Sequence, residues 1–452
     1  MDVELLSRVQ FAFTAAFHYI YPPMSIGLGL LLVVMEGMYL RTKDPVYERL
    51  TKFWVKVFAL IFAVGVASGI VLEFEFGTNW ATYSRYVGDI FGSALAAEGI
   101  FAFFLESGFL AILVFGWDRV KPAMHFFATC MVALGSSFSA VWIIVANSWQ
   151  QTPAGYVIEG EGLAARARIT DFWAMVFNPS SLDRLTHTVV AAWATGGFLV
   201  ISVSAFYLLK RQHMDMARAA LKIAVPFTLA VTLIQPFLGH KSAVGVAKSQ
   251  PAKMAAFEGH HDSSKPMDLV LLGYYDAASE GVKGISVPGG ASLLLKGDAK
   301  APITGLNDFA REDRPPIQAA FQFYHLMVAL GMAMILLALA ASIQLWRGRL
   351  ENSTLLLRLL VPAILLPHLA NQAGWFAAEV GRQPWIVYGL LRTSDGLSKV
   401  VKANQVLGSL ILFGFLYVLL FVLFVYLLDR KIKAGPDGDL ADSISLAHGV
   451  QQ

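Results

Sequence analysis

The chain has 452 residues, of which 56% are hydrophobic and only 15% charged, and its mean hydropathy is +0.58. Because soluble domains carry about 25% charged residues, this composition predicts a polytopic membrane protein. The net charge of +3 gives no support to a nucleic-acid partner, and the single cysteine, Cys130, excludes disulfides, iron–sulfur clusters and cysteine-based zinc sites within this chain.

Nine apolar stretches follow one another along the chain, each of about 20 residues and so long enough to cross a bilayer. The acidic start of the chain lacks the pattern of a cleavable signal peptide, so we expect the first stretch to be a spanning helix. The stretches are centred near Leu28, Val64, Phe104, Leu134, Ile201, Leu229, Ala333, Leu366 and Leu416.

Lysine and arginine gather in alternate connections. They are dense in the first, third, fifth and seventh connections and after the last apolar stretch, whereas the second connection carries only Arg85. The positive-inside rule therefore predicts an amino terminus outside and a carboxyl terminus in the cytoplasm. The basic residues are Arg41, Lys43, Arg49, Lys52, Arg119, Lys121, Lys210, Arg211, Arg218, Lys222, Arg347, Arg349, Arg358, Arg430, Lys431 and Lys433.

Two longer connections are predicted to lie outside. The fourth, residues 150–186, contains the run DFWAM at 171–175, which indicates a short interfacial helix anchored by aromatic side chains. The sixth, about residues 241–316, is the one polar domain and is rich in Gly, Pro, Lys and Asp. Connections much longer than about 15 residues are usually functional or disordered, so we expect a functional loop here.

Polar residues that could bind metal interrupt four of the apolar stretches. Glu379 ends the eighth stretch, and His18, His187 and Met327 lie in the first, fifth and seventh, all placed by the predicted topology in the outer half of the membrane. An ionisable group there is a functional candidate by default. Histidine with methionine makes a low-spin haem site, while a lone histidine or carboxylate leaves one iron face open for dioxygen. The alternatives are structural histidines, a core methionine and a simple Glu379–Arg382 pair.

The third stretch carries two further carboxylates, Glu98 and Glu106. In a regular helix they would lie within about 80° of each other and about 12 Å apart along the axis. This arrangement predicts a proton relay, with Ser139 and Asn147 of the fourth stretch as intermediate hydrogen-bonding groups. The alternative is that neighbouring helices satisfy each carboxylate separately.

Five short motifs together resemble subunit I of the cytochrome bd quinol oxidases. The resemblance runs from the first apolar stretch to the ninth. It implies an all-α fold of two four-helix bundles with a peripheral ninth helix, a bacterial cytoplasmic membrane location and a second membrane subunit, with a small single-helix subunit as a further candidate partner. The motifs are FGTNW at 76–80, YVGDIFG at 86–92, FFLES at 103–107, FGWDR at 115–119 and GRQPW at 381–385.

The resemblance also implies the cofactors and their ligands. His187 and Met327 match the axial ligands of a low-spin haem b. His18 and Glu379 match the ligands of two high-spin haems, a haem b and either a haem d or a third haem b, and which residue holds which haem stays open.

Four more positions bear on the haems. Trp375 matches an aromatic residue among them, and Arg382 is placed to neutralise a haem propionate. Two positions depart from the family pattern: His325 stands where an arginine precedes the methionine ligand by two residues, and Gln372 stands where an acidic residue is common. Charges count for more at low dielectric, so these departures lead to the hypothesis of a variant branch such as the cyanide-insensitive oxidases.

The sixth connection resembles the quinol-binding loop, with Gln250, Lys253 and Glu258 on its motif. A quinol gives up two protons with its two electrons, so Glu258 can accept a proton while Lys253 steadies the negative charge. The loop lacks the insertion of longer members, which implies the short-loop class. Whether ubiquinol or menaquinol is the donor stays open.

These features predict an oxidase that takes electrons from quinol at the outer face and reduces dioxygen to water with cytoplasmic protons, passed through Glu98 and Glu106 or through the partner subunit. Such a reaction generates proton motive force without a pump. The main alternative is a proton-coupled secondary transporter, but the sequence shows neither the inverted repeats nor the broken helices common in transporters. A cofactor-free assembly subunit would not explain the four candidate ligands at one depth.

The expected organisation has five parts. They are the first four-helix bundle at 1–150, the outer connection with helices five and six at 151–240, the quinol-binding loop at 241–316, helices seven and eight at 317–380, and the outer loop, helix nine and cytoplasmic tail at 381–452.

Overall fold

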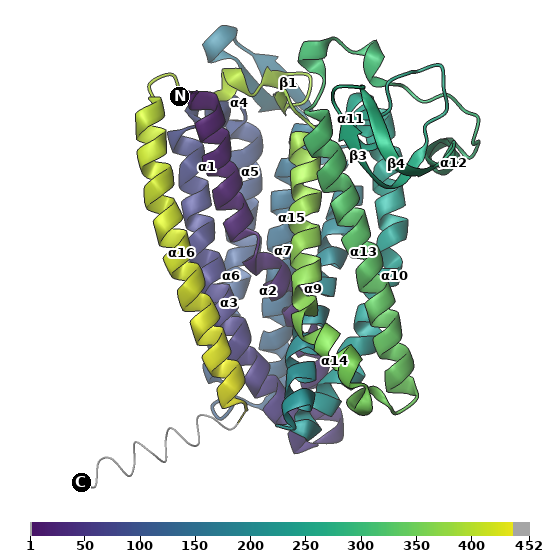
Figure 1. The fold of residues 1–452 in the computed structure, drawn as a ribbon. Coiled ribbons are helices and arrows are strands. Elements are labelled where there is room, and N and C mark those ends of the chain that lie inside the picture. Colours follow the sequence, from purple (N-terminus) through teal and green to yellow (C-terminus); the bar gives the residue numbers. More distant parts are fainter. Residues whose placement is uncertain (1, 437–452) are drawn as a thin grey trace.

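The computed structural model describes residues 2–436 (Figure 1). Long helices lie side by side and form the body of the molecule, while short strands and small helices collect at the end where α1 begins. Within residues 2–436, nine helical segments are long and apolar enough to cross a membrane. This confirms the predicted all-helical membrane class and the predicted number of spans.

The spans that the described part contains are made of both single and interrupted helices. In chain order they are α1 (Val3–His18) with α2 (Tyr21–Thr42), α3 (Pro45–Thr78), α5 (Gly88–Glu98) with the π-helical turn η1 (Gly99–Phe103) and α6 (Phe104–Phe115), α7 (Pro122–Gln151), α9 (Ser181–Lys210), α10 (Met214–Ser249), α13 (Ile317–Trp346), α14 (Thr354–Leu360) with η6 (Val361–Ile364) and α15 (Leu365–Val380), and α16 (Ala403–Ala434).

Interruptions in the spans correct one expectation, since we predicted no broken helices. The first span ends its outer part at His18 and restarts at Tyr21, with Pro22 and Pro23 in the first turn of α2. Proline has no N–H to give to a helix but fits the first turn, so it marks a restart. His18 is therefore the last residue of α1 and does not lie inside a continuous helix. The eighth span also changes to a 3-10 turn at η6.

The helices of the two halves of the chain meet along α2. It packs against α3 and α7 on one side and against α9 on the other, while α9 packs against α10, and α13 against α15. At the α2–α9 crossing, a Cβ on Gly27 would lie 2.3 Å from the Ala192 carbonyl oxygen, and one on Gly196 would lie 2.2 Å from the Gly27 carbonyl carbon. Small residues let membrane helices approach this closely. α16 packs on α1 and α3.

Three antiparallel hairpins and four short helices cover the end of the molecule where α1 begins (Figure 1). The interfacial helix predicted at 171–175 is present one residue later. These elements are β1 (Tyr156–Glu159) with β2 (Arg166–Ile169), β3 (Leu269–Asp276) with β4 (Gly281–Val287), β5 (Trp385–Val387) with β6 (Leu391–Arg392), and the helices α4 (Ala81–Tyr86), α8 (Phe172–Val176), α11 (Pro251–Glu258) and α12 (Gly290–Lys296).

The sixth connection is shorter than its predicted range of 241–316. Helix α10 runs to Ser249, and its 36 residues extend over about 54 Å, more than the roughly 30 Å of a bilayer core. Its last turns therefore continue past the membrane core and lead directly into α11. The hairpin of β3 and β4 lies beside α11 in Figure 1.

Candidate functional site

The four predicted iron ligands lie on four different helices. His187 is in the second turn of α9, Met327 is about three turns into α13, Glu379 is one residue from the end of α15, and His18 ends α1. In the described residues no three His, Cys, Asp or Glu side chains converge as a bare metal site. A haem iron, by contrast, needs only one or two axial side chains.

Helix α3 holds the His18 ring by one nitrogen. Nδ1 of His18 lies 3.0 Å from the hydroxyl of Ser68. Gly69, the next residue on α3, faces the ring, and a Cβ there would lie 3.2 Å from Cε1 of His18. Because Nδ1 is engaged by Ser68, a further ligand of the ring would bind at Nε2.

His187 is held by α10 through its backbone. The amide of Gln235 donates to the His187 carbonyl oxygen at 3.0 Å, and its nitrogen lies 3.5 Å from Nε2 of the ring. Gly239 faces the ring at Cε1, where a Cβ would lie at 3.5 Å. Nδ1 of His187 is buried without a hydrogen-bond partner, so this ring nitrogen is free to bind another group.

Met327 lies against the backbone of α15. A Cβ on Gly374 would lie 2.7 Å from the Met327 sulfur, so glycine is needed for this contact. Trp375, the next residue, is half-buried and packs on Phe376, which stacks on Phe323 of α13 at a centroid distance of 5.1 Å. The thioether and the predicted aromatic residue thus lie at the same α13–α15 seam.

Glu379 is engaged at both oxygens. Oε1 accepts hydrogen bonds from Asn147 at 3.1 Å and Gln151 at 3.2 Å, both on α7, and Oε2 pairs with Arg382. The pairing with Arg382, weighed as the alternative to a ligand role, is therefore present. Asn147 was predicted to support the Glu98–Glu106 relay; the structure instead places its amide on Glu379.

Two more cations approach Glu379. Arg184 donates to the amide oxygen of Asn147, and Lys253 donates to the side-chain oxygens of Gln151 and Gln250, at 2.9 Å in each case. Both cations interact electrostatically with the carboxylate of Glu379. Burial, followed by repulsion from Arg184, lowers the pKa of Lys253 well below its ordinary value.

The cluster of Arg184, Lys253, Glu379 and Arg382, called the cation cluster below, has more positive than negative charge. Three cations face one carboxylate, and one positive charge remains in excess even when Lys253 is neutral. Nε of Arg184 and Nε of Arg382 are both buried without a partner. Buried charges require opposite charges nearby, so the cluster is suited to an anionic group such as a carboxylate, which guanidinium groups bind in bidentate fashion.

These observations fit haem. The donor set is imidazole and thioether, the usual axial ligands, and Gly69, Gly239 and Gly374 let three of the four candidates pack directly against neighbouring helices. The cation cluster offers free N–H groups for propionates. Glu379 fits less directly, because Asn147, Gln151 and Arg382 already occupy its oxygens.

The two carboxylates of the third span both face α7. Ser139 donates to Glu98, and a Cβ on Gly135 would lie only 2.5 Å from Cγ of Glu106. The π turn η1 lies between the two glutamates and inserts about one extra residue into the helix, which removes about 100° of rotation. The offset of the two glutamates around the helix therefore falls from about 80° to about 20°, which is within the predicted bound, and the π turn brings both side chains onto the α7 side.

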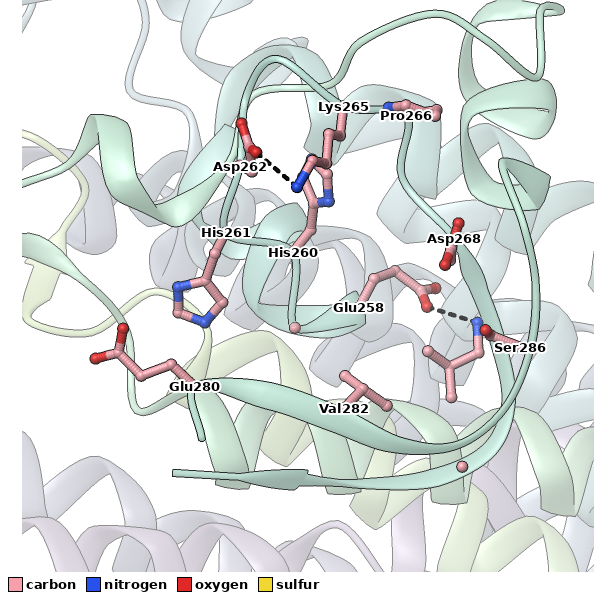
Figure 2. A pocket seen from close by; sticks show the side chains of 13 residues that line it. Glu258, His260, His261, Asp262, Lys265, Pro266, Asp268, Glu280, Val282 and Ser286 are labelled. Carbon is pink, nitrogen blue, oxygen red and sulfur yellow. Dashed lines mark hydrogen bonds and ion pairs between the residues drawn. The ribbon is translucent and has the colours of Figure 1, made fainter. Parts of the chain in front are cut away.

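Glu258 lines a cavity of about 320 Å³ beneath the β3–β4 hairpin, shown in Figure 2. Pockets for small molecules begin at about this volume. Oε2 of Glu258 accepts from the Val270 N–H at 3.1 Å, while Oε1 is buried without a partner. Burial raises the pKa of Glu258 to about 8. The cavity is lined by Glu258, Gly259, His260, His261, Asp262, Lys265, Pro266, Asp268, Val270, Glu280, Val282, Gly284 and Ser286.

Gln250 and Lys253 do not line this cavity, although the motif predicted that they act with Glu258. Gln250 donates to the Gln151 carbonyl oxygen at 2.8 Å, and Lys253 belongs to the cation cluster. On a helix, five residues separate two side chains by about 140°, so α11 turns Lys253 and Glu258 to different sides.

The two departures from the family pattern have defined contacts. Nε2 of His325 lies 3.2 Å from the Val270 carbonyl oxygen and 3.7 Å from Oε2 of Glu258, so this residue lies beside Glu258 and not in the cation cluster. Gln372 donates to the Ala16 carbonyl oxygen at 2.7 Å, which ties α15 to the last turn of α1.

Sequence reasoning missed three buried ionisable groups. Arg184 lies three residues before His187, inside a span, and its position alone makes it a functional candidate. Glu75 accepts a hydrogen bond from Thr14 at 2.7 Å. The third is a pair formed by Glu36 and His125 in the opposite half of the molecule, and each of its two side chains is only 1% exposed. No sequence spacing predicts this pair, because its members are 89 residues apart.

Comparison with known proteins gives one consistent result. The family model described as cytochrome bd terminal oxidase subunit I matches residues 6–436. The chain is 39% identical to cytochrome bd ubiquinol oxidase subunit 1 of Bacillus subtilis (97% of this chain, 95% of the relative) and 32% identical to cytochrome bd-II ubiquinol oxidase subunit 1 of Escherichia coli (96% and 97%). A chain of the bd oxidase from Geobacillus thermodenitrificans superposes with a TM-score of 0.88 at 29% identity, covering 96% of this chain and 99% of that one.

Proposed function

The chain belongs to the family of cytochrome bd terminal oxidase subunit I, and from this premise we propose how its residues carry out quinol:oxygen oxidoreduction. Its relatives make it a respiratory electron-transport protein of this activity with haem cofactors and a quinol substrate. A transporter function is not favoured. The finer points below concern the haem ligands, the quinol cavity, the proton route and the assembly.

The cation cluster is the observation that carries the haem assignment. Arg184 and Arg382 would hold haem propionates through their free Nε–H groups, and His187 with Met327 would hold a low-spin haem b. His18 and Glu379 would serve two high-spin haems, one of them a haem d or a third haem b. Bound haem would supply one-electron transfer and a place for dioxygen. Trp375 would exclude water between the sites.

On the quinol side, the cavity of Figure 2 would admit the quinol ring next to the free Oε1 of Glu258. In its ionised form this carboxylate accepts a proton from the quinol hydroxyl. With Lys253 turned away, the group that can steady the charge comes from the cavity wall, where Lys265, which pairs with Asp262 at 3.1 Å, carries N–H donors. Ubiquinol and menaquinol both fit this chemistry.

On the dioxygen side, Glu98 and Glu106 would carry protons along α7. The contact between Ser139 and Glu98 and the close approach of Glu106 to Gly135 place both carboxylates on one helix face. Protons would be taken from the cytoplasm and quinol protons released outside, so the reaction generates proton motive force without a pump. This requires the amino terminus outside and the carboxyl terminus inside.

The assembly follows the family. The helices would form two four-helix bundles, with α16 peripheral, in the bacterial cytoplasmic membrane. Subunit II would cover the exposed side of the third span, whose apolar window is only 17% buried in this chain. A small single-helix subunit is a further candidate partner. His325 and the absence of a loop insertion support the short-loop class and a variant branch.

The dithionite-reduced minus oxidised spectrum of the detergent-purified complex tests the haem assignment. We expect a low-spin b signal that disappears in Met327→Ala and His187→Ala, because each substitution removes one axial ligand. Met332→Ala is the matched control on α13, since Met332 is 51% exposed. Loss of the signal in the control, or its retention in both ligand variants, would contradict the assignment. A far-red band separates haem d from a third haem b.

A further inference from the structure

A buried carboxylate–imidazole pair lies in the half of the membrane opposite the candidate haem site. Glu36 is two turns from the end of α2, and His125 is in the first turn of α7. Oε1 of Glu36 lies 2.7 Å from Nδ1 of His125, and both side chains are only 1% exposed. The proposed reaction assigns them no role.

The hydrogen bonds of the pair define its proton content. Nε2 of His125 lies 3.1 Å from the carbonyl oxygen of Leu113 on α6, and a carbonyl only accepts, so Nε2 carries a hydrogen. The short contact between Nδ1 and Glu36 then requires one more proton between these two atoms. Thr129 donates to the second oxygen of Glu36. The contact between Glu36 and His125 thus holds one shared proton.

One face of α7 connects this pair to the predicted relay. Thr129, Ser136 and Ser139 follow His125 by 4, 11 and 14 residues, which places all three within about 40° of it around the helix. Ser139 donates to Glu98. The Ser136 side chain is buried and interacts with Glu106, one residue after Gly135, where Glu106 touches α7. A polar line therefore runs along α7 from the pair to both carboxylates of the relay.

We propose that Glu36 and His125 form a proton-loading site that takes protons from the cytoplasmic face and passes them along α7 to Glu106. This inference rests on the proposed oxidase function. The shared proton leaves the pair for the Glu106 carboxylate, and a proton from water replaces it. Glu106 touches α7 at Gly135, ten residues after His125, so the step covers about 15 Å along the helix axis, with the Thr129 and Ser136 hydroxyls and intervening waters as the carriers.

The groups around the pair suit an uptake site. The Trp117 ring lies over His125 at 4.1 Å between centroids, and the Lys52 ammonium of α3 lies 5.0 Å from the Trp117 ring. Lys52 also pairs with Glu48 at 2.6 Å. The other titratable neighbours are Cys130 on α7, which feels the Glu36 charge, and Tyr39 on α2, which packs on Trp117. The partly exposed Lys52–Glu48 pair thus lies between solvent and the buried Glu36–His125 pair.

Quinol-driven oxygen consumption by the purified complex, measured against pH, tests the proposal. Glu36→Gln keeps the shape of the side chain but cannot release a proton. We expect its rate to fall on the order of tenfold with an unchanged haem spectrum, and to fall further as pH rises, because protons must then come directly from bulk water. Glu36→Asp should restore most of the rate and the original pH profile.

Asp215→Asn is the matched control, since Asp215 forms an exposed ion pair with Arg49 at the same end of the molecule. A Glu36→Gln enzyme with wild-type rate and pH profile overturns the proposal. Where that variant loses its haems, Thr129→Val decides: it leaves the pair intact, and the proposal requires a slower rate with steeper pH dependence. A wild-type complex without quinol-driven oxygen consumption would instead refute the proposed function itself.

Discussion

Two regions of the molecule handle buried charge in opposite ways. At the end covered by the hairpins, the cation cluster sets Arg184, Lys253 and Arg382 against the single carboxylate of Glu379. Along α7, by contrast, Glu98 is met by a hydroxyl and Glu36 by a hydroxyl and an imidazole. The first region has fixed charges with positive excess, and the second has carboxylates beside groups that exchange protons.

This difference separates two tasks of one reaction. Fixed cations of arginine keep their charge at any physiological pH, so they can balance anionic groups that stay bound. Carboxylates beside hydroxyls and an imidazole can change protonation state, which a proton route requires. Substitutions in the first region should therefore change cofactor retention and stability, and substitutions in the second should change rate alone.

The largest expected effect is that of Arg382→Gln. The substitution breaks the buried contact between Arg382 and Glu379 while Arg184 and Lys253 stay near the carboxylate, so it costs at most about 3–5 kcal/mol of folding free energy, and it also removes a donor for a propionate. We expect a lower haem-to-protein ratio and a lower thermal unfolding temperature in the purified complex.

Arg392→Gln is the control for this loss. Arg392 pairs with Asp313 at 2.5 Å, but both side chains are about one-third exposed, and such surface pairs contribute about 0–1 kcal/mol. An Arg382→Gln complex with full haem content and unchanged unfolding temperature would contradict this division of tasks between the two regions, because the cation cluster would then have no role in haem retention.

A smaller effect, on rate alone, is expected for Glu106. Glu106→Gln should slow oxygen consumption on the order of 100-fold, with haem content unchanged, since the amide cannot carry a proton. Gly135→Ala should act in the same direction, because its Cβ would lie 2.5 Å from Cγ of Glu106 and displace the carboxyl. Gly408→Ala, where a Cβ meets nothing within 4 Å, is the matched control. Haem loss in Glu106→Gln, or an unaltered rate, would contradict a relay.

The spans could be predicted from the sequence because apolar length is a local property. All nine centres fall inside the spans of the described residues, and the interfacial helix at α8 follows from its aromatic run. The π turn η1 could not be predicted, since it arises in a plain apolar stretch where regular helix is the default. The break after His18 could have been expected from Pro22 and Pro23.

The site was predicted less completely, because partners come from distant parts of the chain. Glu379 is met by Asn147, 232 residues away, and the Glu36–His125 pair joins different helices; no spacing rule reaches such contacts. The motif around Glu258 suggested a joint action with Lys253, but motif proximity does not say which side of α11 each residue faces. Arg184 could have been predicted from the sequence, because a charged residue inside a membrane span is itself a candidate functional residue.

The smallest expected effect concerns Glu258, a carboxylate outside the spans that belongs to neither region. Burial raises its pKa to about 8, and Asp268 acts in the same direction; His325 also faces it, at 3.7 Å. Roughly one carboxyl in ten is then ionised at pH 7 and nine in ten at pH 9. Since only the ionised form accepts a quinol proton, the rate of quinol oxidation should rise roughly tenfold over this range.

Rates of quinol oxidation between pH 6 and 9 check this, with Glu258→Gln expected to lose the rise and Asp268→Asn to move it to lower pH. The sign for stability is opposite: the raised pKa means that the folded form binds the extra proton, so the contribution of Glu258 to stability is complete below its ordinary pKa and is lost as pH rises through about 8. A wild-type rate that is flat or falling over this range would contradict the role of Glu258 as the acceptor of the quinol proton.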